Sequence, residues 1–147
     1  MIIESLKSLY NRDLNKLKFE IGSYQSEDSI WKIDKNISNS AGNLCLHLVG
    51  NLNTYIGAEL GKTGYVRNRE LEFSLKNIPK TELIEKVEAT IKMIDSTLDK
   101  LSQEDLEKDY PTEALGYKMT TGYFLIHLLS HLDYHLGQIN YHRRLLD

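Results

Sequence analysis

The sequence is poor in cysteine, proline and long apolar runs, and each shortage excludes a class of protein. Its 147 residues include a single cysteine, Cys45, so neither an intramolecular disulfide nor a thiolate zinc cluster can form. The most apolar segment, residues 123–132, contains two histidines, and the N-terminal segment already carries charge at Glu4 and Lys7. Neither a membrane span nor a signal peptide is therefore expected, and we expect a cytoplasmic protein.

The chain also lacks a large excess of charge of either sign. The chain has 18 basic and 21 acidic residues, which give a formal net charge of -3. Nucleic-acid-binding domains usually present a strongly basic face, so no nucleic-acid partner is expected. The chain also lacks internal repeats, low-complexity tracts and a Pro/Gly/Ser linker, and we expect a single domain over residues 1–147.

Apolar residues recur at spacings of three and four in four segments, which predicts four amphipathic helices. These segments are residues 2–21, 39–60, 81–101 and 121–146. Gly22 and Gly61 are expected to end the first two helices. A threonine at the N-cap position and Arg143 and Arg144 in the last turn suit the fourth. Four helices without a convincing strand predict an all-α four-helix bundle.

Residues 62–79 form a long connection between the second and third predicted helices. Apolar and polar residues alternate within it at positions 70–75, but no partner strand is present, so we expect an extended crossover. Fully extended, the connection reaches roughly 55–60 Å, against roughly 33 Å for the second helix. The third helix could therefore begin at either end of the bundle.

Four of the five histidines lie on the fourth predicted helix: His127, His131, His135 and His142. At about 100° per residue they share one sector of that helix with apolar side chains, so these imidazoles are expected to point toward the buried side. The fifth histidine, His47, lies at the border of the apolar face of the second helix.

Two histidines at i and i+4 can place both rings on one cation, and His131 and His135 have this spacing. The third ligand must come from another element, and His47 is the one histidine outside the fourth helix. A structural zinc site normally has four protein ligands, whereas His47, His131 and His135 would leave positions open. His127 and His142 are expected to pack, to lie at an interface or to support the ligands. The alternative is that all of these histidines are hydrogen-bonded core residues.

Three further residues near the histidines carry weaker signals. Gly137 lies inside the fourth helix, where glycine is unfavourable, and this predicts a close approach by another backbone or a ligand. Gln138 could orient a ligand or substrate, or be a core amide. Cys45 is expected to be a small buried residue rather than a nucleophile.

The long connection also carries two arginines, Arg67 and Arg69. They could meet an anionic substrate over the site. The alternative, which we favour, is that they pair on the surface with Glu70 or Glu72.

The segments NLCLHLVGNLNTYIGAELGKTGYVRNRELEFS and FLIHLLSHLDYHLGQINYHRRLL resemble the DinB-like (DinB/YfiT-like) superfamily, and most closely its DUF1572 branch. The resemblance implies an up-down-down-up four-helix bundle, often dimeric. It also implies that His47, His131 and His135 bind a divalent metal such as zinc or nickel. Some members transfer bacillithiol or mycothiol, some isomerise maleylpyruvate with a thiol cofactor, and many, this branch included, have no known reaction.

The sequence thus favours a metal-dependent enzyme that activates water or a low-molecular-weight thiol, as a hydrolase or a thiol S-transferase. The alternatives are a non-catalytic metal or small-ligand binding module and a structural dimeric bundle. The expected partners are a small-molecule substrate and a second copy of the chain, with no membrane.

Overall fold

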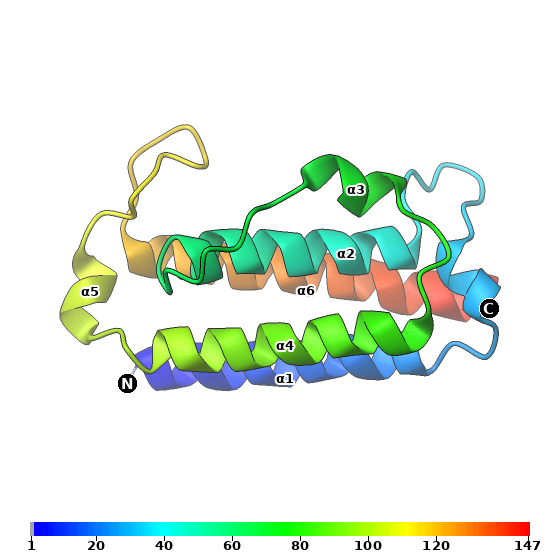
Figure 1. Ribbon diagram of the computed structural model, residues 1–147, viewed down its shortest axis with the longest axis horizontal. Helices are drawn as coiled ribbons and strands as arrows, with labels where there is room; N and C mark the ends of the chain where they lie inside the picture. Colours follow the sequence, from blue (N-terminus) through cyan, green and yellow to red (C-terminus); the bar gives the residue numbers. More distant parts are fainter. Residues whose placement is uncertain (1) are drawn as a thin grey trace.

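Four long helices form the frame of the molecule in the computed structural model, which describes residues 2–147 (Figure 1). They are α1 (Ile2–Gly22), α2 (Ala41–Leu52), α4 (Lys80–Leu98) and α6 (Thr121–Leu146). The shorter elements are η1 (Glu27–Trp31), η2 (Asn53–Ala58), α3 (Arg69–Ser74) and α5 (Gln103–Glu107). The predicted all-α four-helix bundle is confirmed.

The four long helices run up-down-down-up, as the resemblance implied. In Figure 1, α1 and α6 run toward one end of the bundle while α2 and α4 run toward the other. Helix α1 packs on α4 and α6, and α2 packs on the same two helices from the opposite side. The long connection therefore crosses the length of the bundle to join the parallel helices α2 and α4, and the buried apolar side chains form one core.

The second predicted helix is regular only up to Leu52. It begins after Ser40, whose side chain accepts a hydrogen bond from the backbone N–H of Asn43. From Asn53 the backbone widens into the π-helical segment η2. The side chains of Asn53 and Thr54 donate to carbonyl oxygens four residues earlier and so compete for the α-helical acceptors. Such π-helical turns are frequent at functional sites.

The third predicted helix ends three residues earlier than expected, at Leu98. Lys100 and Leu101 donate backbone hydrogen bonds to the carbonyls three residues before them, which tightens the chain into a turn. A capping box between Ser102 and Asp105 then starts the separate helix α5. The fourth helix has the predicted bounds and is capped by Thr120.

The prediction of an extended crossover over residues 62–79 was wrong for residues 69–74, which form α3. The Asn68 side chain accepts a hydrogen bond from the backbone N–H of Leu71, and this N-cap stabilises the start of α3. The alternating apolar pattern of the segment did not indicate a helix. Helix α3 packs on α2. The Asn43 side-chain amide on α2 donates to the carbonyls of Glu72 and Leu75 and holds α3 in place. Within residues 2–147, no helix combines the length and apolarity that crossing a membrane requires.

Candidate metal centre

The predicted trio of histidines comes together where α2 faces α6. The Nε2 atom of His131 lies 3.2 Å from Nε2 of His47 and 3.1 Å from Nε2 of His135. His47 is buried, and the other two imidazoles are half-buried. In a tetrahedral site with metal–nitrogen bonds of about 2.0–2.1 Å, ligand nitrogens lie about 3.3 Å apart. The spacing of the three rings therefore fits a single metal ion.

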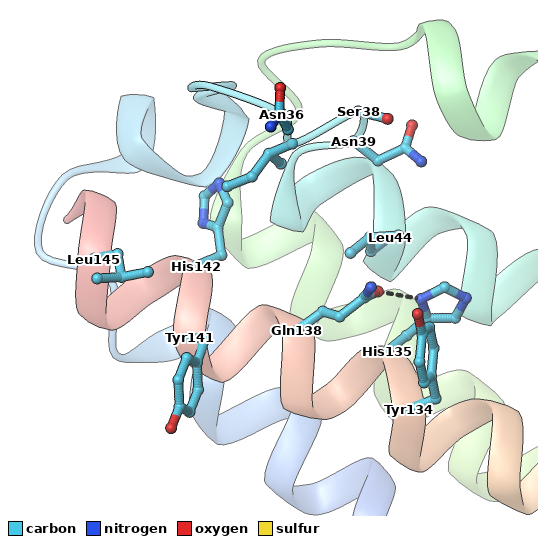
Figure 2. A pocket seen from close by; sticks show the side chains of 11 residues that line it. Asn36, Ser38, Asn39, Leu44, Tyr134, His135, Gln138, Tyr141, His142 and Leu145 are labelled. Atoms are coloured by element: carbon cyan, nitrogen blue, oxygen red, sulfur yellow. Dashed lines mark hydrogen bonds between the residues drawn. The ribbon is translucent and has the colours of Figure 1, made fainter.

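Hydrogen bonds behind the rings fix which nitrogen of two histidines carries the proton. The Nδ1 atom of His47 lies 3.1 Å from a carboxylate oxygen of Glu72. The Nδ1 atom of His135 lies 2.7 Å from the side-chain carbonyl oxygen of Gln138, as Figure 2 shows. Both oxygens accept, so both Nδ1 atoms donate and both Nε2 atoms present lone pairs toward His131. His131 can donate to only one of them, whereas a cation accepts all three lone pairs.

Burial favours the neutral imidazoles that bind metal. Desolvation, with His135 and His47 nearby, lowers the pKa of His131 to about 4. Burial also lowers the pKa of His47, although the Glu72 carboxylate opposes this shift. At pH 7 His47 is therefore neutral and donates its Nδ1–H to Glu72. No proton has to leave either ring before a metal binds.

Glu72 links His47 to an arginine of the crossover. The Arg67 guanidinium contacts both carboxylate oxygens of Glu72, at 2.8 and 2.9 Å. It also lies 3.4 Å from His47 Nδ1, but the shorter carboxylate contact sets Nδ1 as the donor. A Cβ atom on Gly50 would overlap the Glu72 carboxylate, so the glycine makes room for it. A carboxylate behind a ligating histidine orients the ring and raises its basicity.

The prediction that Arg67 pairs with Glu72 is confirmed, but the pair is not on the surface. Glu72 is buried, and its contact with His47 was missed by sequence reasoning. The available signal was weak: Glu72 follows the second helix on a crossover that returns along it. The alternating pattern around Glu72 suggested extended chain and did not indicate a side chain directed at α2.

Two buried polar atoms at this centre have no hydrogen-bond partner within residues 2–147: Asn51 Oδ1 and His131 Nδ1. Asn51 Oδ1 is an acceptor. His131 Nδ1 is a donor in the tautomer whose Nε2 carries the lone pair. Asn51 lies one turn after His47 on α2. Buried polar groups are nearly always paired, so two exceptions at one place favour a bound water, ion or ligand there.

Two cavities flank the trio. The larger, of about 500 Å³, reaches His135 and Gln138 and is bordered by Tyr134, His142 and the segment that precedes α2 (Figure 2). The smaller, of about 210 Å³, is bordered by His47 and His131. Between them, the two cavities therefore reach all three histidines.

The remaining predicted histidines have separate roles. His142 is buried: Tyr24 Oη donates to its Nδ1 at 2.7 Å, and its Nε2 donates to the Lys32 carbonyl at 2.9 Å. It is a core residue that ties the end of α6 to the chain before α2. His127 is half-buried, stacks on Phe124 and borders the smaller cavity.

The outcomes for the other predicted residues differ. Gln138 is exposed and its side chain contacts His135, so it is not a core amide. Cys45 is buried, and burial raises the pKa of its thiol to about 12, which confirms it as a packing residue. No backbone of the described residues makes the close approach expected at Gly137, because none of their atoms would lie within 4 Å of a Cβ placed there. Arg69 borders the smaller cavity.

The fold and the three convergent imidazoles define a four-helix bundle protein with a candidate three-histidine metal centre. The chain belongs to the family described as "Protein of unknown function (DUF1572)", whose model matches residues 3–147. No curated protein matches the sequence.

One solved structure with the same fold is that of a conserved protein of a locus from Enterococcus faecalis. The TM-score is 0.74 at 16% sequence identity, and the match covers 97% of this chain and 95% of the other. At this identity the likeness supports the fold and not a shared activity.

Proposed function

We propose that the protein is a metal-dependent enzyme in which His47, His131 and His135 hold one divalent cation, zinc or nickel. The observation that carries the proposal is the convergence of three Nε2 atoms, two of them fixed as lone pairs by Glu72 and Gln138. Imidazole nitrogens are common ligands of both metals. The resemblance to the DinB-like superfamily supports the same ligand set.

Such an ion supplies Lewis acidity and lowers the pKa of a coordinated water or thiol. Three protein ligands leave positions for a substrate, which is the pattern of catalytic rather than structural zinc. The protein contributes neutral ligands, a buried Glu72 behind His47 and two cavities that reach the trio. These features support a hydrolase or a transferase of a low-molecular-weight thiol.

Elemental analysis of protein purified without a histidine tag tests the metal site. We expect about one zinc or nickel per chain in the wild type, and loss of that metal in His131→Ala. The matched control is His127→Ala, one turn earlier on α6, which should keep the metal because His127 contacts none of the three Nε2 atoms in the described structure. Metal retained by folded His131→Ala would refute the ligand set.

A second assay separates an enzyme from a binding module. Metal-loaded protein is incubated with a panel of ester and amide substrates and, separately, with low-molecular-weight thiols and electrophilic acceptors. Turnover that disappears in His131→Ala supports the enzyme. Saturable binding without turnover across both panels would instead support the binding module.

We also propose that the protein forms a homodimer through the outer face of α6. Tyr123, Ile126, Tyr134 and Tyr141 share this face with exposed fractions of 50–65%, and nothing lies near Gly137 between them. A self-complementary strip of large and small side chains suits a two-fold partner helix. Light scattering should give twice the chain mass, and Tyr134→Asp should give a monomer.

A measured mass equal to that of one chain, for the wild type at micromolar concentration, would refute the proposed dimer. The cytoplasm remains the proposed location, and one domain over residues 1–147 the proposed organisation. The lone buried thiol of Cys45 and the continuous core support these two proposals.

A further inference from the structure

Two arginines and two histidines of α6 border the smaller cavity beside the trio. Arg67 and Arg69 border it from the crossover and α3, His127 and His131 border it from α6, and no Asp or Glu among residues 2–147 lines it. Its volume of about 210 Å³ corresponds to roughly seven waters at about 30 Å³ each. The cavity is therefore large enough for a small organic molecule and too small for a drug-sized ligand.

The two arginines differ in how their charges are balanced. Arg67 is held by both oxygens of Glu72 and has no net charge to offer. Arg69 is exposed, forms no ion pair within the described residues and lies over the Phe73 ring at 5.2 Å. A cation–π contact of this kind uses the face of the guanidinium and leaves its N–H groups for a ligand. Arg69 thus brings to the lining of the cavity one positive charge that no ion pair within the described residues balances.

The wall of this cavity combines polar side chains with an apolar part. Phe124 and Leu128 of α6 and Leu115 of the preceding connection line the cavity, and Tyr55 of the π-helical segment lies under Arg67 at 5.9 Å. A cavity that offers both a cationic side chain and an apolar part of its wall is complementary to an amphipathic anion. Arginine recognises carboxylates through two parallel hydrogen bonds, which favours a planar carboxylate over a spherical anion.

We propose that the smaller cavity binds a small organic carboxylate, with its carboxylate on Arg69 and its apolar body against Phe124 and Leu128. The cavity borders His47 and His131, so a carboxylate bound there would lie beside the proposed metal centre. Its role as a substrate therefore rests on the proposed function. The substrate class is then a small carboxylic acid, bound with its apolar body beside the metal-holding histidines. Binding of the carboxylate itself depends on Arg69 and requires no metal.

The test uses the full-length, metal-free protein and two probes of the same shape, benzoate and benzamide. Isothermal titration at low ionic strength should show saturable binding of benzoate and much weaker binding of benzamide. Arg69→Gln should weaken benzoate binding roughly five- to tenfold, as expected for the loss of a charge-assisted hydrogen bond at a partly exposed site. The ring resonances of His127 should shift on addition of benzoate in NMR spectra.

Arg144→Gln is the matched control. Arg144 is also an exposed arginine over an aromatic ring, that of Tyr141 at 5.2 Å, but it borders neither cavity. Its replacement should leave the benzoate dissociation constant unchanged. Equal binding of benzoate and benzamide, no binding of either, or equal losses in the two arginine variants would each overturn the proposal.

Adding zinc distinguishes this proposal from the proposed function. Benzoate that binds only zinc-loaded protein and is insensitive to Arg69→Gln is held by the metal, which overturns the arginine site and leaves the metal centre standing. Benzoate binding that depends on Arg69 in a protein that takes up neither zinc nor nickel supports the carboxylate site and refutes the metal centre.

Discussion

Helix α6 carries histidines of the same orientation in two different settings. At its C-terminal end both nitrogens of His142 are hydrogen-bonded, one to a tyrosine hydroxyl and one to a backbone carbonyl. In its middle, Nε2 of His131 faces two other imidazoles and its Nδ1 has no partner. The sector of the helix does not decide the role of a histidine. The groups that the opposite elements present decide it.

Metal addition gives the largest expected contrast between the two settings. Zinc at about 1,000 times its dissociation constant should stabilise the wild type by about 4 kcal/mol, because the folded state alone presents three converged nitrogens. His131→Ala should lose this increment. Urea unfolding in the presence of zinc or of a chelator measures this stabilisation. If zinc stabilised His131→Ala as much as the wild type, His131 would not be a metal ligand.

The next largest effect belongs to the other end of α6. His142→Ala should lower the unfolding free energy by roughly 2–4 kcal/mol, because it leaves a cavity and the unpaired Tyr24 hydroxyl and Lys32 carbonyl. Its zinc content should equal that of the wild type. Tyr24→Phe, which removes only the hydroxyl, should cost about 1 kcal/mol. Loss of zinc from folded His142→Ala would mean that the two settings are coupled.

A third variant tests the support behind His47. Glu72→Gln keeps the size of the side chain but removes the charge that anchors both His47 and Arg67. Metal affinity should fall about 10- to 100-fold, or roughly 1.4–2.7 kcal/mol. Competition with a chromophoric chelator measures this change. Glu70→Gln, on the exposed side of α3, is the control; an equal loss there would point to the overall charge of α3 instead.

What could be predicted from the sequence depended on local regularity. The bounds of α6 and the pairing of His131 with His135 follow from the helical repeat, and His47 followed by elimination. The roles of Glu72 and His142 depend on contacts between distant segments: Glu72 is 25 residues from His47, and Tyr24 is 118 residues from His142. Helical periodicity carries no information about such contacts.

The sequence-based predictions of α3 and of the π-helical segment failed for a related reason. Helix α3 depends on the Asn68 cap and on the Asn43 amide that reaches it from α2. The π-helical turn depends on Asn53, whose side chain also donates to Thr90 of α4. In both segments, hydrogen bonds from single side chains determine the backbone conformation. The apolar pattern of the sequence does not reveal these hydrogen bonds.

The smallest expected effect compares two glycines inside long helices. Gly137→Ala should raise the unfolding free energy by up to about 1 kcal/mol, since a methyl group there meets nothing and helical alanine is favoured over glycine. Gly50→Ala should instead destabilise the protein and weaken metal binding, because its methyl overlaps the Glu72 carboxylate. Unfolding at two protein concentrations separates the gain within the helix, which is independent of concentration, from any change in dimerisation. A loss in Gly137→Ala that persists at both concentrations would show that a contact within the chain requires this glycine.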